Sequence, residues 1–227
     1  MNRRTYGQTC ALALALDAIG ERWTLLIVRD LLLGPLRYKD LQDGLPGIST
    51  NLLSTRLHHL EEIGLVEKAT LPPPAGSSVY QLTPDGRSLG PAIAALGTWG
   101  VRFIAHAPVG SHRSAAWAVQ GLAFMADLDQ AADTNDSYEF QLDGESFLIH
   151  AHGGSVRAER GSTPKADVVV ETTVETMRSL RHGEQVLDDG DAGLAISVLG
   201  DAAAVERCAA ILRLPWLRLG VREGADV

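Results

Sequence analysis

The sequence is poor in cysteine and contains no long apolar run. Two cysteines, Cys10 and Cys208, occur in 227 residues, which excludes a disulfide framework or a cysteine-based zinc site. No apolar stretch approaches the roughly 20 residues that span a bilayer. The stretch CALALALDAIG, residues 10–20, is interrupted by Asp17 and is followed by no small-residue cleavage pattern, so we reject a signal peptide. We therefore expect a cytoplasmic protein with no membrane partner.

The sequence also lacks the motifs of common catalytic sites. It contains no GxSxG nucleophile motif, no phosphate-binding loop, no GxGxxG motif and no paired acid motif. The run HGGS, residues 152–155, resembles the oxyanion-loop glycines of esterases, but no nucleophile motif accompanies it. We therefore expect that the protein is not an enzyme and has no cofactor.

Positive charge is in deficit overall: 20 Lys and Arg stand against 28 Asp and Glu, which gives a formal net charge of -8. Such acidity argues against DNA binding. The charge is unevenly distributed, however. Residues 1–110 hold 10 Lys and Arg against 9 Asp and Glu, whereas residues 111–227 hold 10 against 19. The acidity belongs to the second half, so the first half remains compatible with a DNA partner.

The first half is predicted to contain short helices. Apolar spacing predicts buried helices over 9–19 and 22–34 and a short helix over 37–45. After a turn at residues 46–48, Ser49 stands where an N-cap belongs. Leu53, Leu57 and Leu60 then share one face of a further helix.

A predicted β-hairpin and a last helix follow. Residues 63–71 and 77–83 are β-prone and are joined by a Pro/Gly loop. The last helix has Thr83 as its N-cap and Pro84 in its first position, and Pro91 is expected to kink or interrupt it. The order helix, short helix, turn, helix, hairpin is that of a winged helix-turn-helix.

The helix after Ser49 presents short polar side chains opposite its leucines. An α-helix fits the DNA major groove, and such side chains can reach base edges there. Asn51 is the best candidate for a bidentate contact with adenine; the alternative for each residue is a solvated surface position. The candidate DNA-reading residues are Ser49, Thr50, Asn51, Ser54, Thr55 and His58.

Contacts to phosphate are expected from the flanks of this helix. Arg37 and Lys39 begin the preceding helix, and Arg56 either reaches phosphate or pairs with a nearby acid. In the hairpin, Ser77 and Ser78 can bond phosphate, but no cation occurs between Lys68 and Arg87. We therefore expect few ion contacts and a weak salt dependence of DNA binding.

Several motifs resemble those of HxlR-type bacterial transcriptional regulators, relatives of MarR. They are the cysteine near the N-terminus, GERWTLLIVRDL, RYKDL, GISTNLLSTRLHHLEEIGLV and YQLTPDG, and they cover residues 8–104. The resemblance implies a homodimer that binds a palindromic double-stranded operator. It places the dimer contacts around residues 9–19 and 88–104, with Trp99 and Phe103 as apolar anchors. The alternative is that both aromatics belong to the core of one subunit.

The resemblance also draws attention to Cys10, because the matching cysteine is a redox sensor in some members of the family. A reactive thiol needs exposure and a lowered pKa, which a helix N-terminus can supply. We favour the alternative that Cys10 is a small buried apolar residue, and redox sensing remains the second reading.

The second half is predicted to be α+β. Residues 114–128 form an amphipathic helix, and 137–161 a hairpin or meander with Asp143–Gly144 as a turn. A strand at 166–173, a helix at 174–184, a strand at 193–201 and a helix begun by Asp201 follow. This order, with ADVVVETTVETMRSLRHGE and GLAISVLGD, resembles the sterol carrier protein type-2-like fold over residues 112–214.

That second resemblance implies an apolar tunnel and hence an apolar small-molecule effector. The alternatives are that the half is only a dimerisation or partner surface, or that the whole chain is a lipid carrier. Side chains that could line a tunnel, or simply form the core, are Trp117, Phe124, Phe140, Phe147, Ile149, Met177 and Leu180. His150 and His152 face the same way, but with His182 they lack a further ligand at convincing spacing, so we expect no metal.

The expected fold class is α+β. A winged helix-turn-helix DNA-binding domain occupies residues 1–106, and an α/β sterol-carrier-like domain, for ligand binding or dimerisation, occupies residues 107–227.

Overall fold

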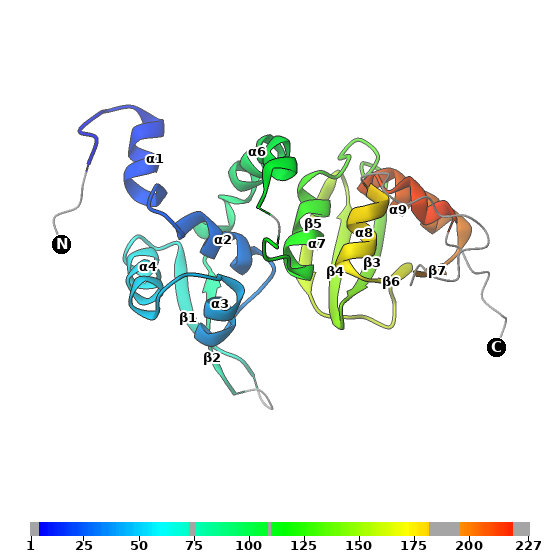
Figure 1. The fold of residues 1–227 in the computed structure, drawn as a ribbon, viewed down its shortest axis with the longest axis horizontal. Helices are drawn as coiled ribbons and strands as arrows, with labels where there is room; N and C mark the ends of the chain where they lie inside the picture. The colour runs from blue at the N-terminus through cyan, green and yellow to red at the C-terminus, as the bar shows by residue number, and fades with distance from the viewer. Residues whose placement is uncertain (1–4, 73–75, 109, 182–195, 220–227) are drawn as a thin grey trace. The chain divides into compact units, whose positions relative to one another are not determined.

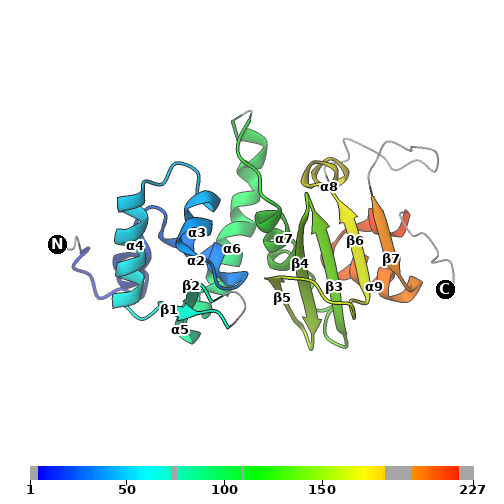
Figure 2. The ribbon, with the colours of Figure 1, turned by 90° about the horizontal axis from the view of Figure 1, so that it is seen from below.

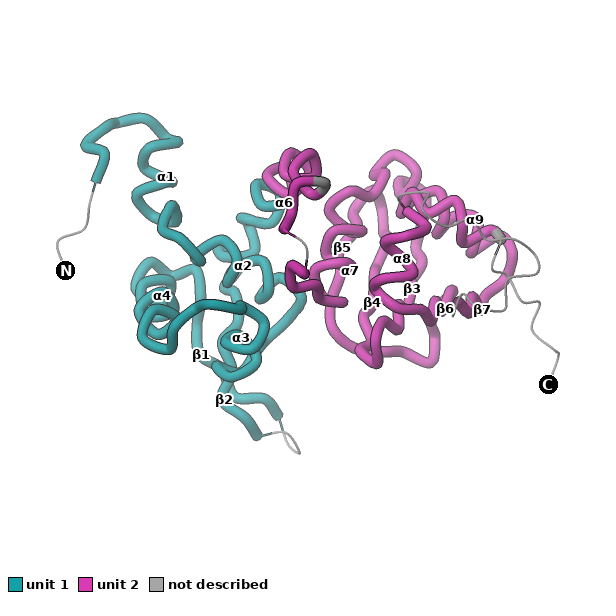
Figure 3. The backbone as a smooth tube through the Cα atoms, viewed as in Figure 1, with its two compact units in different colours: residues 1–93 teal, residues 94–227 magenta. Residues whose placement is uncertain are grey.

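The computed structural model describes residues 5–72, 76–108, 110–181 and 196–219. The chain divides into two compact units, residues 1–93 and 94–227 (Figure 3). The helix α6 (Gly90–Gly100) runs from one unit into the other. Within the described residues, no helix is both long and apolar enough to cross a membrane.

The first unit has the element order predicted for a winged helix-turn-helix (Figure 1). Its helices and strands are α1 (Ala11–Ile19), α2 (Thr24–Leu32), α3 (Tyr38–Gly44), α4 (Thr50–Glu62), β1 (Val66–Thr70), β2 (Ser78–Leu82) and α5 (Pro84–Arg87). The predicted interruption of the last helix is also present. Thr83 caps α5, whose first residue is Pro84, and α6 begins again at Gly90 and ends in a 3-10 helix, Val101–His106.

The leucine face predicted for α4 forms the core of this unit. Leu53, Leu57 and Leu60 are fully buried, and the Ser49 hydroxyl accepts a hydrogen bond from the Leu52 N–H. Burying three such side chains contributes several kcal/mol, at roughly 1.5–3 kcal/mol each. Apolar burial on one face therefore fixes which face of α4 remains available to a partner.

The hairpin is attached to the helices through a short backbone bridge. Strands β1 and β2 pair antiparallel, with Val66 opposite Leu82. Leu36, just before α3, exchanges two backbone hydrogen bonds with Tyr80, of 3.0 and 2.8 Å. The hairpin and the helix-turn-helix are thus joined by hydrogen bonds as well as by packing.

The prediction that residues 9–19 form a helix is confirmed, but the prediction that this helix is buried is wrong within one chain. Only Ala13 of α1 is buried, and Leu12, Leu14 and Leu16 are exposed. Apolar spacing identifies a face that avoids water, but it does not identify what covers that face.

The second unit is α+β and contains a five-stranded mixed sheet of order β5-β4-β3-β6-β7 (Figure 2). β3 pairs antiparallel with β4 and parallel with β6. Its elements are α7 (Ala115–Phe124), β3 (Asn135–Leu142), β4 (Glu145–His152), β5 (Ser155–Arg160), β6 (Val168–Thr172), α8 (Val174–Arg181), β7 (Ser197–Gly200), α9 (Ala202–Leu212) and a 3-10 helix, Pro215–Leu219.

One face of this sheet carries the aromatic core of the second unit. Tyr138, Phe140, Phe147 and Ile149 are fully buried on one face, where α7 packs against β4 and β5 and α9 against β6.

The predicted Asp143–Gly144 turn joins β3 to β4, and both residues have positive φ, 50° and 83°, as a two-residue hairpin turn requires. This turn sets the register that sends alternate side chains to opposite faces.

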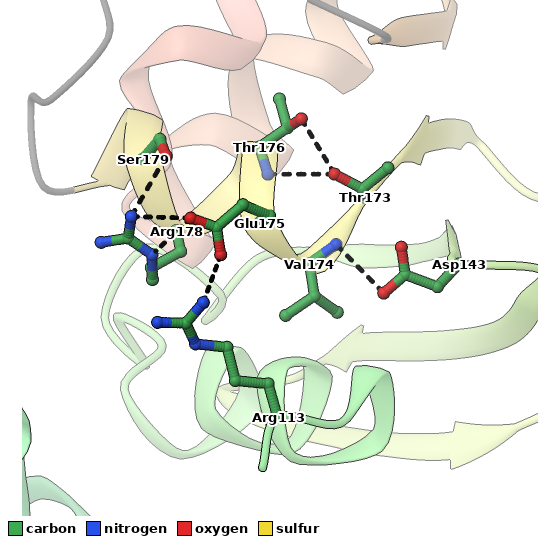
Figure 4. Close-up of polar contacts among 8 residues, drawn as sticks. All are labelled: Arg113, Asp143, Thr173, Val174, Glu175, Thr176, Arg178 and Ser179. Atoms are coloured by element: carbon green, nitrogen blue, oxygen red, sulfur yellow. Dashed lines mark hydrogen bonds and ion pairs between the residues drawn. The ribbon is translucent and has the colours of Figure 1, made fainter. Parts of the chain in front are cut away.

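Polar contacts fix the start of α8 (Figure 4). The Thr173 hydroxyl accepts from the Thr176 N–H at 3.0 Å, and Asp143, in the hairpin turn, accepts from the Val174 N–H at 3.4 Å. Glu175 forms ion pairs with Arg113, which precedes α7, and with Arg178. Segments from three parts of the second unit therefore meet at one helix end.

Candidate nucleic-acid interface

The exposed face of α4 presents side chains that are free to bond a ligand. Asn51 and Ser54 are exposed, and neither side chain makes a hydrogen bond to any other described residue. The Asn51 amide carries both donors and an acceptor. These two residues are therefore the best-placed groups of α4 for reading base edges.

The remaining short polar residues of α4 have partners within the unit. The Thr55 hydroxyl donates to the Asn51 carbonyl at 2.8 Å. The Thr50 hydroxyl accepts from the Gln42 amide at 3.2 Å, and the Ser49 oxygen accepts from Leu52. Ser49 and Thr50 keep a hydroxyl proton for donation, since each uses its oxygen as an acceptor.

The N-terminal end of α4 is held by α3. The Tyr38 hydroxyl donates to the Thr50 carbonyl at 2.7 Å, beside the Gln42–Thr50 contact. Two side chains of α3 therefore position the first turn of α4, from which Asn51 projects. Apolar spacing over residues 37–45 predicts a short helix, but it gives no sign that the Tyr38 hydroxyl bonds the next helix.

The later turns of α4 are held by the end of α1 and by the segment between α1 and α2. The Arg56 guanidinium pairs with Glu21 at 2.8 Å and donates to the Arg22 carbonyl at 3.2 Å, and only 16% of its side chain is exposed. His59 Nε2 lies 2.9 Å from the Ala18 carbonyl. Of the two readings of Arg56, pairing with a nearby acid is the one observed.

Exposed basic groups occur at the start of α3 and on α4. Arg37 is the N-cap residue of α3 and Lys39 lies in its first turn, and both are exposed. Neither forms an ion pair with a described residue. His58 is exposed and lies 3.3 Å from Glu62, which competes with phosphate for its proton.

The hairpin offers little positive charge. Lys68 pairs with Glu61 at 3.3 Å and lies over the Tyr80 ring. Ser78 is exposed at the start of β2, and Ser77 is half-buried with its carbonyl accepting from the Leu71 N–H. Residues 73–75, within the Pro/Gly loop, lie outside the described residues.

Cys10 is exposed at the N-terminus of α1, so the expectation that it is buried is wrong. Hydrogen bonds from the backbone N–H groups of Ala13 and Leu12 lower the pKa of its thiol. Cys208 is buried in α9, and burial raises the pKa of that thiol. The two cysteines thus have opposite chemical character.

The residues expected to line an apolar tunnel divide into two groups. Phe140, Phe147 and Ile149 have no exposed surface, and Met177 and Leu180 are nearly as buried. Trp117 and Phe124 are half-buried on α7, and three of that helix's six buried residues are alanines. Burial of this kind suits a packed core as well as a tunnel wall.

Metal ligands do not gather in the described residues: no group of three or more His, Cys, Asp or Glu could hold an ion there. His150 and His152 do share a face, as predicted, and His182 lies outside the described residues.

Comparison with known proteins identifies the family of the first unit. Residues 18–108 match the HxlR-like helix-turn-helix family. The uncharacterized HTH-type transcriptional regulator YvaP of Bacillus subtilis is 34% identical over 90 residues, covering 40% of this chain and 83% of YvaP. The HTH-type transcriptional regulator YodB of the same organism is 34% identical over 89 residues, 39% of this chain and 80% of YodB.

A third relative has a higher sequence identity. An uncharacterized HTH-type transcriptional regulator of Mycobacterium tuberculosis is 40% identical over 90 residues, which cover 40% of this chain and 56% of that protein. The match lies in the part of the chain that carries α2 to α6, where the Ser49 cap, the leucine face and the wing hairpin are found. The chain therefore belongs to the HxlR-like helix-turn-helix family.

Proposed function

We propose that the chain is a sequence-specific DNA-binding transcriptional regulator that acts as a homodimer on a palindromic operator, with no catalytic step. The observation that carries this proposal is the exposed face of α4, where Asn51 and Ser54 have no partner among the described residues. A helix with a buried leucine face and free amide and hydroxyl groups opposite suits the major groove. The relatives named above are described as HTH-type transcriptional regulators.

A gel-shift experiment with the chain's own upstream DNA tests this function. A regulator gives a shift that the specific fragment competes away and a scrambled fragment of equal length does not. A carrier with a vestigial DNA module gives no selective shift even at low salt, which would refute the proposal.

The homodimer is supported by apolar side chains that one chain leaves exposed. Leu12, Leu14 and Leu16 on α1 are exposed. On α6 and the 3-10 helix after it, Leu96, Trp99 and Phe103 are exposed, with the two aromatic rings 5.0 Å apart. Monomeric proteins seldom expose such sets of apolar residues. The reading of Trp99 and Phe103 as core of one subunit is disfavoured by exposures of 54% and 51%.

The proposed effector is an apolar small molecule bound in the second unit, in keeping with its resemblance to the sterol carrier-like fold. Two buried oxygens, Gln120 Oε1 on α7 and Thr172 Oγ1 on β6, have no hydrogen-bond partner among the described residues, and a hydroxyl group on an otherwise apolar ligand could bond them. A long-chain fatty acid is expected to raise the Tm of the full chain and to change its DNA affinity. A Tm and an affinity unchanged across a broad apolar library would refute the effector while leaving DNA binding intact.

A thiol-based redox response is a second candidate for control, and the exposure of Cys10 favours it. A thiol with a lowered pKa at a helix N-terminus is more readily oxidised. Diamide treatment is expected to change the DNA affinity of the wild-type chain and not that of Cys10→Ser. An equal response of both proteins would exclude Cys10 as the sensor.

A further inference from the structure

A hollow on the polar face of the second unit's sheet is unused by the function proposed above. Its volume is about 490 Å³, and it lies over β3, β4 and β5. Six lining side chains form two rows across these strands: Asn135, His152 and Ser155 in one row, and Ser137, His150 and Arg157 in the other. Side chains directly opposite each other in such rows lie about 5 Å apart, so the six form one continuous surface.

This hollow is distinct from the proposed apolar site. Along β4, His150 and His152 alternate with Ile149 and Ala151, which are buried on the other face. The strand period of two therefore sends the imidazoles and the core residues to opposite sides of the sheet. A ligand of the hollow meets polar groups, whereas a ligand of the core meets apolar groups.

Arg157 is the arginine in the lining of the hollow. The Arg157 guanidinium forms no ion pair with the residues that the structure describes. The nearby carboxylates already accept hydrogen bonds. Asp136, which also lines the hollow, pairs with Arg207 at 2.7 Å and accepts from the Tyr138 hydroxyl at 2.9 Å. Glu159 accepts from the His150 ring at 3.0 Å, and Asp167 accepts from the Ser137 N–H and hydroxyl at 2.7 and 3.2 Å. The Arg157 guanidinium is thus the group of the lining that remains able to pair with an anionic group of a ligand.

The imidazoles supply hydrogen-bond acceptors beside this charge. His150 Nε2 faces the Glu159 carboxylate, and His152 Nδ1 lies 2.9 Å from the Asn135 amide oxygen. Because both partners can only accept, each of these nitrogens carries a proton. In the neutral rings, His150 Nδ1 and His152 Nε2 are then lone-pair acceptors, and the Ser155 hydroxyl is a further polar group.

We propose that this hollow binds a small polar anion bearing a carboxylate or phosphate group together with hydroxyl groups. Arg157 takes the anionic group, since a guanidinium matches two oxygens of a carboxylate or phosphate. The two imidazoles accept hydrogen bonds from the hydroxyls. A volume near 490 Å³ lies within the range of small-molecule sites, roughly 300–1,000 Å³. Because the second half of the chain is acidic, affinity rests on these local contacts rather than on long-range attraction.

Titration of the full chain with citrate, inorganic phosphate and glycerol tests this proposal, by calorimetry and by the imidazole NMR signals of His150 and His152. Citrate or phosphate is expected to bind saturably and to shift both signals, and glycerol is not. Which anion binds distinguishes a carboxylate site from a phosphate site. Arg157→Gln is expected to weaken binding at least about tenfold. Lys165→Gln removes an exposed charge outside the lining and is expected to change binding by less than about twofold.

Three results would each overturn the proposal. They are no saturable shift with either anion, glycerol binding as well as the anions, and an equal loss of affinity in Arg157→Gln and Lys165→Gln. Thermal melts of both variants, whose replaced side chains are exposed, verify that the comparison is made between folded proteins.

Discussion

Gly86 occupies a place in α5 where a larger residue does not fit. A Cβ atom there would lie 2.0 Å from the Leu65 carbonyl oxygen and 3.0 Å from its carbon. The obstacle is backbone rather than a flexible side chain, so the chain itself must move to admit a methyl group. This glycine of the TPDG motif therefore has a steric explanation: it allows α5 to pack against the residue that leads into β1.

Replacement of this glycine is expected to destabilise the first unit. Gly86→Ala is predicted to lower the free energy of unfolding by about 1–3 kcal/mol, as overpacking does elsewhere. The matched control is Gly100→Ala, because a Cβ at Gly100 meets nothing within 4 Å and its φ of -70° is helical. The control is expected to keep or raise stability, by up to about 1 kcal/mol. Urea denaturation measures both, and an unchanged midpoint for Gly86→Ala would contradict the steric account.

The two cysteines are expected to differ sharply in reactivity. Backbone hydrogen bonds lower the pKa of the exposed Cys10 thiol, and burial raises that of Cys208. Because the thiolate is the nucleophile, iodoacetamide is predicted to label Cys10 in the folded chain and Cys208 only in denaturant. Mass spectrometry of wild-type and Cys10→Ser protein measures this. Labelling of folded Cys10→Ser at the wild-type rate would show that the assignment is wrong.

At the scale of elements, α4 and the β1–β2 hairpin have few cationic side chains without an ion-pair partner among the described residues. Arg56 and Lys68 are engaged by Glu21 and Glu61, which leaves Arg37 and Lys39 as the candidates for phosphate contact. A dimer then makes about four such contacts, and the logarithm of the binding constant is predicted to fall with the logarithm of salt concentration with a slope near -4.

Lys39→Gln removes one of these contacts from each subunit. The slope is expected to become shallower by about 2 in the dimer, whereas Arg87→Gln, which removes an exposed cation of α5, is expected to leave it within about 0.5. Fluorescence anisotropy at several salt concentrations gives the slopes. A wild-type slope steeper than about -8 would mean that further cations reach the DNA.

The boundaries and the buried face of α4 could be predicted from neighbouring residues, whereas its contacts with distant residues could not. The Ser49 cap and the spacing of Leu53, Leu57 and Leu60 depend on neighbours within one helix, and both are confirmed. The Glu21–Arg56 pair joins residues 35 positions apart, and no periodicity indicates that distance. The sequence therefore permits both phosphate contact and an ion pair for Arg56, and the fold, which brings Glu21 within 2.8 Å, gives the ion pair.

The same limit explains why the sequence predicted α1 as a helix but did not predict that its leucines are exposed. Alternating alanine and leucine predicts a helix that avoids water, and the helix is present. The pattern is the same whether the chain itself or a second copy covers the leucines, so the burial predicted for this segment was wrong.

The polar hollow over β3, β4 and β5 was visible in the sequence only as two histidines on one strand, because its other members come from neighbouring strands.

At the scale of the whole molecule, the exposed leucines of α1 predict a homodimer. The wild-type chain is expected to sediment at twice its mass of 24.3 kDa. Leu14→Glu places a charge on the exposed apolar face of α1 and is predicted to shift the protein toward monomer, since a buried unpaired charge is costly at an interface. The control Leu128→Glu alters a leucine that is similarly exposed, 52% against 56%, in the second unit. Equal sedimentation of both variants would remove α1 from the interface.

Sequence-specific reading by Asn51 is the central claim, and selection of bound fragments from genomic DNA tests it most directly. Wild-type protein is expected to enrich a shared palindrome with half-sites about one helical turn apart. Asn51→Ala is expected to lose that enrichment while remaining folded, because the Asn51 side chain bonds to no other described residue, and the exposed-amide control Gln130→Ala is expected to retain it. Recovery of the same fragments by wild type and Asn51→Ala, with no shared motif, would contradict the account.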